Sequence, residues 1–248
     1  MQKTSFYNLS LNILDTPKCL EICSDFLMGK QCRTLFFINA HCFNMAQKNE
    51  AYKICLDKAD LVLNDGIGIE LAARYSGISL PENMNGTDLI PKIIEMAYNQ
   101  NKKFFLLGGQ PGVIEKTKEV LEKKHPGIKI VGSHSGYFDS AENEKIITEI
   151  NNSQANLLIV GMGVPRQEIW IMENLERFNQ LKLAIGGGAI VDFIAGKVKR
   201  APLWIQKIKM EWFYRFIHEP KRLFKRYFVG NFVFFMYIIR LKYSVKNQ

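Results

Sequence analysis

Short apolar runs alternate along this chain with longer segments in which apolar residues recur every three or four positions. The runs have the length of strands, and the longer segments have the spacing of helices that bury one side. Strands that alternate with helices pair in parallel and are covered on both faces. The pattern therefore predicts an α/β fold: a Rossmann-like, mostly parallel sheet with helices on both faces. The expected strands are residues 34–38, 61–63, 103–107, 128–131, 157–160 and 183–185, and the expected helices are residues 16–28, 43–55, 70–74, 87–98, 113–124, 141–151 and 167–178.

The alternation stops at Arg200. Beyond it, Trp, Phe and Ile recur at helical spacing with Lys and Arg between them, which is typical of a helix that lies in the interface of an anionic membrane. Two alternatives stay open: the apolar side packs on the sheet, or the basic residues follow a nucleic-acid backbone. We favour the membrane and expect no nucleic acid. The predicted division is an α/β core of residues 1–199 and a basic amphipathic C-terminal appendage of residues 200–248.

The charge of the chain supports this division. Of 248 residues, 33 are Lys or Arg and 24 are Asp or Glu, so the net charge is +9. Residues 1–199 hold 22 basic and 22 acidic residues, whereas residues 200–248 hold 11 basic and 2 acidic ones. The whole net charge therefore lies in the appendage, where it favours an acidic partner surface.

The cysteines and the apolar segments bear on location. The five cysteines form no C-x-x-C pair, which is typical of reduced thiols inside a cell. The first residues lack the apolar core of a signal peptide, and the longest apolar tract, residues 228–239, is shorter than the 20 or so residues that span a bilayer. We expect a cytoplasmic protein that is peripherally attached to the inner face of the cell membrane.

Asp65 is the candidate catalytic residue. It follows the expected strand at residues 61–63, and ligands of parallel sheets bind beyond the carboxyl ends of the strands. Gly66 and Gly68 allow close approach of the backbone, and the following helix favours an anion at its start. The alternative is that Asn64 or Asp65 only caps this helix. The spacing G-x-G-x-x-G is not met, so a nicotinamide site is not predicted.

Three further strands end in glycine-rich turns: Gly108-Gly109, Gly161-Met-Gly163 and Gly186-Gly-Gly188. Backbone amides at one sheet edge suit a diphosphate, so the turns predict a nucleotide or nucleotide-sugar site. The chain has no G-x-x-x-x-G-K-[ST] loop for ATP and no metal-binding motif. We expect chemistry without a bound metal ion or cofactor. Thr87 is expected only to cap the helix at residues 87–98.

Seven segments in order carry a family resemblance: Asn39-Ala-His, Ala59-Asp-Leu-Val-Leu-Asn-Asp-Gly-Ile-Gly68, Asn85-Gly-Thr-Asp-Leu89, Leu106-Leu-Gly-Gly-Gln-Pro-Gly112, Val160-Gly-Met-Gly-Val-Pro-Arg-Gln-Glu168, Ile185-Gly-Gly-Gly188 and Lys199-Arg-Ala-Pro202. Together they resemble the WecG/TagA/CpsF glycosyltransferases, family 26, from about residue 34 to residue 240. The resemblance implies an inverting, metal-independent enzyme that transfers a sugar from a UDP-sugar to a polyprenyl-diphosphate-linked acceptor in surface polysaccharide synthesis. The sugars transferred in this family include N-acetylmannosamine, its uronic acid, glucose and glucuronic acid.

The resemblance also implies roles for single residues. Asp65 matches the general base, Asn39 and Gln167 match pocket residues, Arg215 and Arg222 match arginines of the appendage, and Lys225 replaces another basic residue. Two positions depart from the family pattern: Phe37 stands where a hydroxyl residue is common, and Asn83 where an arginine is common. The predicted substrate-binding set is Asn39, His41, Asn64, Gly66, Thr87, Gly108, Gly109, Tyr137, Gly161, Gly163, Pro165, Arg166, Gln167, Gly187, Arg215, Arg222 and Lys225.

The expected mechanism needs a base and a source of positive charge. Asp65 would accept the proton of the attacking hydroxyl, with His41 as the alternative base. Glycine-turn amides, Arg166 and the appendage arginines would stabilise the departing UDP. The appendage would fold over the pocket at the membrane, so that deletion of residues 200–248 would abolish transfer and leave the core folded.

Two other function classes stay open. A nucleotide-sugar epimerase or dehydrogenase would need NAD and usually a Tyr-x-x-x-Lys pair. Tyr75 and Tyr137 lack Lys four residues later, whereas Tyr98 and Lys102 have this spacing. A non-catalytic lipid- or nucleic-acid-binding module would use the basic appendage alone. Assembly into a homo-oligomer is compatible with the sequence in each case.

Overall fold

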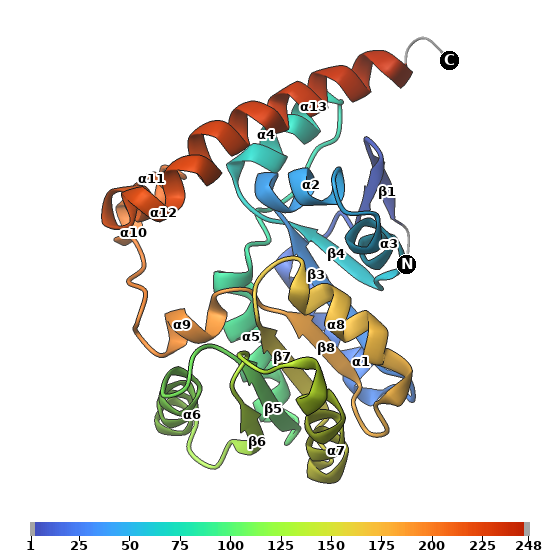
Figure 1. The fold of residues 1–248 in the computed structure, drawn as a ribbon, viewed down its shortest axis with the longest axis vertical. Coiled ribbons are helices and arrows are strands. Elements are labelled where there is room, and N and C mark those ends of the chain that lie inside the picture. The colour runs from blue at the N-terminus through green and yellow to red at the C-terminus, as the bar shows by residue number, and fades with distance from the viewer. Residues whose placement is uncertain (1–2, 246–248) are drawn as a thin grey trace.

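Six parallel strands form the centre of the molecule, as predicted (Figure 1). The computed structural model describes residues 3–245, apart from the side chains of residues 222, 244 and 245. The strand order is β4-β3-β8-β7-β5-β6, and every neighbouring pair is parallel. Strands covered on both faces are apolar throughout instead of alternating, which is why the runs stood out in the sequence. The strands are β3 (Arg33–Ile38), β4 (Leu61–Asn64), β5 (Lys103–Gly108), β6 (Lys129–His134), β7 (Leu157–Gly161) and β8 (Leu183–Gly186).

Helices cover both faces of the sheet, and each face has its own core. Because side chains alternate along a strand, Phe36 and Ile38 of β3 enter the first core, and Leu35 and Phe37 enter the second. The first core is covered by α2 (Ala40–Ala46), α3 (Glu50–Lys58), α4 (Ile67–Tyr75), α7 (Asn143–Ser153) and α8 (Arg166–Asn174). The second is covered by α1 (Thr16–Met28), α5 (Gly86–Asn99), α6 (Val113–Lys124) and α9 (Ile190–Ile194).

An N-terminal hairpin was not predicted. Its strands, β1 (Thr4–Phe6) and β2 (Leu9–Leu11), pair antiparallel and bury Phe6 in the first core. The ring of Phe43 on α2 lies 5.9 Å from the ring of Phe6, 6.3 Å from that of Tyr7 and 5.2 Å from that of Phe234 near the other end of the chain. We call these four residues the aromatic cluster. It joins the hairpin, α2 and the C-terminal helix.

Several helix boundaries differ from the prediction. The segment at residues 43–55 is two helices, since Asn49 caps α3 by accepting a hydrogen bond from Tyr52 N. The predicted cap Thr87 was wrong: the Asn85 side chain caps α5 by accepting from Asp88 N at 3.0 Å. Short 3-10 turns, η1 (Ser140–Glu142) and η2 (Leu175–Arg177), take up the start of one predicted helix and the end of another. At the starts of α3, α5 and η1, a capping side chain decides the boundary.

The appendage is helical but does not stand apart from the core. It contains α10 (Leu203–Lys207), α11 (Glu211–His218), α12 (Pro220–Phe224), the π-helical turn η3 (Lys225–Val229) and α13 (Gly230–Val245). Figure 1 shows α13 lying across α2 and α4. Phe234 and Ile238 of α13 are buried in the first core, and Asn44 Nδ2 donates to Gly230 O at 2.7 Å. The predicted boundary at residue 199 therefore does not divide the packing.

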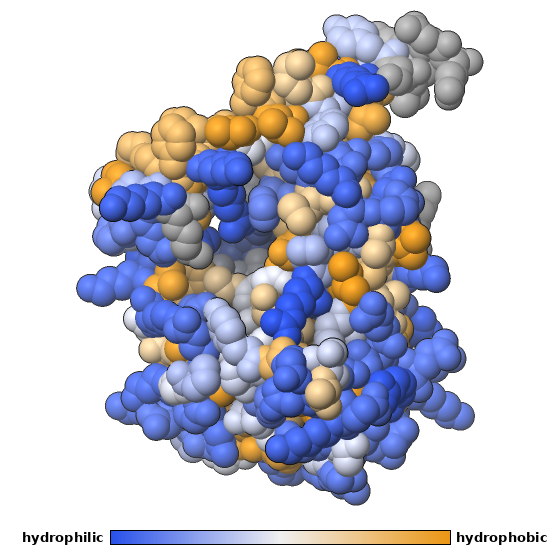
Figure 2. Space-filling view, viewed as in Figure 1, coloured by the Kyte–Doolittle hydropathy of each residue, from blue (hydrophilic) through white to orange (hydrophobic). Residues whose placement is uncertain are grey.

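The outer side of the appendage is apolar. Figure 2 shows apolar side chains along the helices of the appendage, above a hollow in the surface. Within residues 3–245, no helix combines the length and the hydropathy that crossing a bilayer requires. The large exposed apolar residues of the appendage are Leu203, Trp204, Ile208, Phe213, Ile217, Phe224, Phe228, Val229, Phe232, Phe235, Met236, Ile239 and Tyr243.

Candidate active site

A cavity of about 1080 Å³ lies at the carboxyl ends of the central strands. Its floor is formed where β3, β4, β5, β7 and β8 pass into the following turns, which is the edge where parallel sheets bind ligands. Residues of α11 and η3, together with Glu219 between α11 and α12, close the opposite side. Predicted site residues that line the cavity are Asn39, His41, Asp65, Thr87, Gly109, Tyr137, Gly161, Gly163, Arg166, Gln167, Gly187 and Arg215.

Asp65 faces the cavity and does not cap a helix. The cap of α4 is Gly66, whose φ of +86° is accessible to glycine, and no side chain caps this helix. Asn39 Nδ2 donates to Asp65 Oδ2 at 3.1 Å, and Asn39 Oδ1 accepts from Cys42 N at 3.1 Å. Because Asn39 is fixed as the cap of α2, it holds the Asp65 carboxylate in one orientation.

The environment of Asp65 adjusts its basicity. Burial raises the pKa of the Asp65 carboxyl above its ordinary value, while the hydrogen bond from Asn39 and the charges of Arg226 and Arg215 act in the opposite direction. A carboxylate with a raised pKa is a better proton acceptor than a solvated one. For His41, burial and then the charge of Arg226 lower the pKa to about 4. His41 is therefore uncharged at neutral pH and is a weaker base than an ordinary imidazole.

Asn64 and Gly66 were predicted to bind substrate, but neither lines the cavity. Asn64 is buried and donates to Glu82 O at 2.9 Å. Gly66 N donates to the Oδ1 atom of Asn83, the residue that departs from the family pattern, at 2.8 Å. These contacts tie the loop at residues 82–83 to the Asp65 turn. Asn64, Gly66 and Asn83 thus hold the backbone next to Asp65 in place without lining the cavity.

The glycine turns bring several strand ends close together. A Cβ at Gly108 would lie 2.5 Å from Gly161 O, and one at Gly161 would lie 2.9 Å from Gly188 O, so side chains at these positions would separate the turns. Their amides are less available than the sequence suggested. Gly109 N donates to Gly161 O, and Gly187 N donates to Val160 O. These glycines provide close packing, and positive charge for a diphosphate has to come from side chains.

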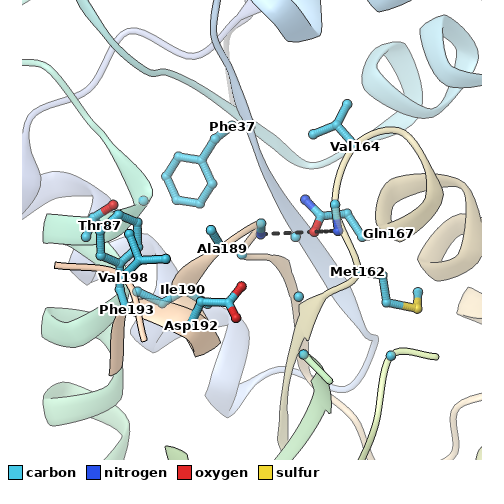
Figure 3. Close-up of a pocket in the computed structure, with 18 of the residues that line it drawn as sticks. Phe37, Thr87, Met162, Val164, Gln167, Ala189, Ile190, Asp192, Phe193 and Val198 are labelled. Carbon is cyan, nitrogen blue, oxygen red and sulfur yellow. Dashed lines mark hydrogen bonds between the residues drawn. The ribbon is translucent and has the colours of Figure 1, made fainter. Parts of the chain in front are cut away.

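Gln167 joins two of the turns. Its Oε1 atom accepts from Gly188 N at 2.9 Å and from Gly163 N at 3.2 Å (Figure 3). The side chain is buried at the first turn of α8 and lines the cavity. Pro165, which precedes α8, does not line the cavity, and neither does Gly108.

Positive charge reaches the cavity from the core and from the appendage. Arg166 is exposed, and its Nη2 atom donates to Phe138 O at 2.8 Å. The guanidinium carbon of Arg215 lies 5.2 Å from the centre of the Phe193 ring. In η3 the cavity residue is Arg226, whereas the predicted Lys225 is exposed and outside the lining. The Arg222 side chain lies outside what the structure describes, so its predicted role stays a prediction.

Other residues of the cavity were missed or misjudged. Asp192 of α9 points into it (Figure 3). Lys197 and Lys199 of the following linker also line it. A pattern of strand ends could not indicate residues on a short helix and a linker. Thr87 was predicted both to cap α5 and to bind substrate; it does not cap, but it lines the cavity beside Phe37.

Phe37 forms part of the wall of the cavity. Phe37 is only 8% exposed, and its ring lies against the backbone of Gly86 at the start of α5, so it gives this part of the wall an apolar surface.

In the part of the chain that the structure describes, no three His, Cys, Asp or Glu side chains are grouped to hold a metal ion. Chemistry without a metal stays a prediction.

A parallel sheet whose strand ends surround one cavity, with an oriented carboxylate near several cations, is typical of an α/β enzyme that binds an anionic ligand. The chain belongs to the Glycosyl transferase WecG/TagA/CpsF family, whose profile matches residues 4–248, and it is a glycosyltransferase. It is 29% identical over 225 residues to a protein of Staphylococcus aureus (strain MW2) and 30% identical over 225 residues to one of strain MRSA252. Both alignments cover 90% of this chain and 86% of the relative. Each relative is named N-acetylglucosaminyldiphosphoundecaprenol N-acetyl-beta-D-mannosaminyltransferase.

Proposed function

We propose that this glycosyltransferase moves N-acetylmannosamine from a UDP-sugar to N-acetylglucosamine linked to a polyprenyl diphosphate, a step in the synthesis of a surface polysaccharide. The sugar and the acceptor are those in the names of its relatives. The observation that carries the proposal is the Asp65 carboxylate, which Asn39 orients at 3.1 Å toward a cavity that also receives Arg215 and Arg226.

In the proposed reaction, Asp65 accepts the proton of the acceptor hydroxyl while the hydroxyl oxygen bonds to the anomeric carbon. The bond from that carbon to the diphosphate oxygen breaks, and its electron pair leaves with UDP. A single displacement of this kind inverts the anomeric configuration. Arg215 and Arg226 stabilise the charge that develops on the diphosphate, and no cofactor takes part.

The appendage is proposed to rest on the inner face of the cell membrane. Its outer side carries exposed Trp, Phe and Ile residues, and its polar side carries most of the excess positive charge of the chain. Arg215 and Arg226 lie on the same segment as this apolar side and reach the cavity. Membrane contact would thus bring the lipid-linked acceptor to the opening of the site.

The test is UDP release by the purified protein with UDP-N-acetylmannosamine and a short-chain lipid-diphosphate acceptor. Asp65→Asn should lower kcat about 10²- to 10⁴-fold and leave UDP binding within about twofold. Asp57→Asn, on the exposed side of α3, is the matched control and should behave as wild type. NMR of the product should show inversion, and EDTA should have no effect.

Three results would count against the proposal. Turnover of a different UDP-sugar would change the assigned sugar and keep the class of reaction. Equal activity of Asp65→Asn would remove Asp65 as the base. Failure of the wild-type protein to bind any UDP compound would contradict the use of a UDP-sugar.

A further inference from the structure

A fully buried carboxylate stands next to Gln167 and is not used in the proposed chemistry. Glu168 is 0% exposed in the first core, although an ionised side chain is costly to bury without a partner. Burial raises the pKa of Glu168 to about 7. Among the described residues, its Oε2 atom has no hydrogen-bond partner. The position of this side chain therefore calls for a reason other than stability.

The titratable groups that the structure describes around Glu168 carry no positive charge. The titratable side chains that face Glu168 are Cys42 of α2 and Tyr52 and Cys55 of α3, and the negative charge of Glu168 contributes to the raised pKa of each. None of the three carries a positive charge at neutral pH. Glu168 is thus not one half of an ion pair with these neighbours, and its side chain accepts a hydrogen bond from Gln167.

That contact fixes the direction of the Gln167 amide. Gln167 Nε2 donates to Glu168 Oε1 at 2.7 Å. A carboxylate only accepts hydrogen bonds, so the amide nitrogen has to face Glu168 and the amide oxygen has to face the other way. A protonated carboxyl group still keeps one oxygen that accepts. The Gln167 Oε1 atom is thereby presented to Gly163 N and Gly188 N, at 3.2 and 2.9 Å.

The space around the two side chains is closely fitted. A Cβ at Gly186 would lie 3.1 Å from Gln167 Nε2 and 3.4 Å from Glu168 Oε1. An amide turned by 180° would place its nitrogen against two backbone N–H groups and its oxygen against the carboxylate, and would lose all three hydrogen bonds. The glycine turns after β7 and β8 would then lose the group that joins them.

We propose that Glu168 is a positioning residue: its buried carboxylate orients the Gln167 amide, and the oriented amide holds the turns after β7 and β8 together as one wall of the cavity. The consequence for substrate rests on the proposed function, because that wall would contact the UDP part of the UDP-sugar. Glu168 itself does not line the cavity.

Two nearly isosteric substitutions separate this role from simple filling of the core. Glu168→Gln keeps an oxygen that accepts from Gln167, whereas Glu168→Met keeps the volume and removes the acceptor. Hydrogen–deuterium exchange is measured on peptides that cover residues 161–164 and 186–189, and UDP affinity is measured by calorimetry. Glu173→Gln, on the exposed side of the same helix, is the matched control.

Glu168→Met should speed exchange in both peptides about tenfold and weaken UDP binding about tenfold, the loss of one to two hydrogen bonds. Glu168→Gln should stay within about threefold of wild type in both measurements. Gln167→Met should reproduce the faster exchange with Glu168 intact, and it serves as the second variant should Glu168→Met not fold. Wild-type exchange in Glu168→Met or in Gln167→Met would overturn the proposal. The exchange data need no ligand, so failure of UDP to bind would count against the proposed function and leave this test intact.

Discussion

At the scale of single residues, Arg226 is a cation of the cavity that the sequence did not predict. The family resemblance pointed to Lys225, but the chain enters the π-helical turn η3 at that residue. An extra residue in a helical turn changes which side chains face inward. Lys225 is exposed, and Arg226 lines the cavity and lowers the pKa of both His41 and Asp65.

Arg226→Gln should therefore change the pH dependence of catalysis as well as the rate. Arg226 lowers the pKa of Asp65, so its loss raises that pKa, and the acid limb of kcat/KM moves to higher pH. At the pH optimum we also expect kcat/KM to fall about tenfold or more, since a cation near the diphosphate is lost. The measurement is kcat/KM from pH 5 to pH 9.

Lys225→Gln is the matched control, one residue away and exposed. It should stay within about twofold of wild type, because an exposed charge is screened by solvent. The interpretation fails if Lys225→Gln loses as much activity as Arg226→Gln, or if the acid limb of Arg226→Gln does not move.

The contrast between Asp65 and Arg226 shows what the sequence could predict at this scale. Asp65 was found because it directly follows a buried strand, which is a local property of the chain, whereas Asn39 was matched through the family resemblance. Gln167 was found through the family resemblance. Arg226 and Asp192 lie on a π-helical turn and a short helix, and which way they face depends on tertiary packing that no local pattern records.

At the scale of elements, Arg200 connects the appendage to the core. Its Nη1 atom donates to Asp88 Oδ1 at 2.5 Å, and its Nε and Nη2 atoms lie 3.3 Å from the carboxylate of Glu211. Asp88 belongs to the first turn of α5, and Glu211 begins α11. Because Arg215 lies one turn further along α11, the position of Arg200 decides where Arg215 meets the cavity.

Arg200→Gln should lower kcat/KM about tenfold, because α11 loses charged hydrogen bonds that each contribute about 1.5–3 kcal/mol and Arg215 is then held less firmly at the cavity. A double-mutant cycle with Asp88→Asn should show coupling, because the two side chains bond directly. Lys209→Gln, which loses a more exposed pair with Glu70, is the control and should cost at most about threefold. Equal losses in Arg200→Gln and Lys209→Gln would argue against a specific role for Arg200.

Strands were predicted better than the ends of helices or the hairpin. Six strands were located because each is a run of apolar residues with few polar interruptions. The hairpin strands have three residues each, too few for a periodic pattern. The apolar spacing of α13 indicated a helix, but not that Phe234 enters the first core, because that contact joins distant parts of the chain.

The packing of α13 changes what truncation should do. Deletion of residues 200–248 removes Phe234 and Ile238 from the first core, so we now expect it to destabilise the sheet and not only to abolish transfer. Phe234→Ala should cost about 3–5 kcal/mol of unfolding free energy, measured by urea denaturation. Phe235→Ala, on the exposed side of the same helix, should cost less than about 1 kcal/mol. Similar costs for the two variants would mean that α13 is not part of the core.

At the scale of the whole molecule, apolar surface and charge are distributed unevenly. The large exposed apolar residues concentrate in the appendage, and so does the net positive charge. Contiguous apolar surface on this scale marks an interaction site. Its position above the hollow in Figure 2 would let one membrane surface meet both the appendage and the opening of the cavity.

Binding to anionic vesicles should depend on this surface. The double substitution Phe232→Ser with Ile239→Ser should lower vesicle partitioning at least about tenfold, since each apolar side chain contributes about 1.5–3 kcal/mol when fully buried. Added salt should weaken wild-type binding, because each Lys or Arg near the surface contributes about 1 kcal/mol. Met28→Ser, at an exposed position on α1, should have no effect in a co-sedimentation assay. Unchanged partitioning of the double variant would place the membrane contact elsewhere.

The aromatic cluster has a consequence for how the chain is made. Phe6 and Phe43 emerge from the ribosome well before their partner Phe234, which lies 191 residues after Phe43. Contacts between residues so distant in sequence form late in folding, and the apolar surface of Phe6 and Phe43 stays exposed until Phe234 covers it. Arg226 is translated shortly before Phe234, so the cation beside Asp65 arrives together with the helix that anchors it. A nascent chain therefore has no complete catalytic cavity until Arg226 and α13 have both been synthesised.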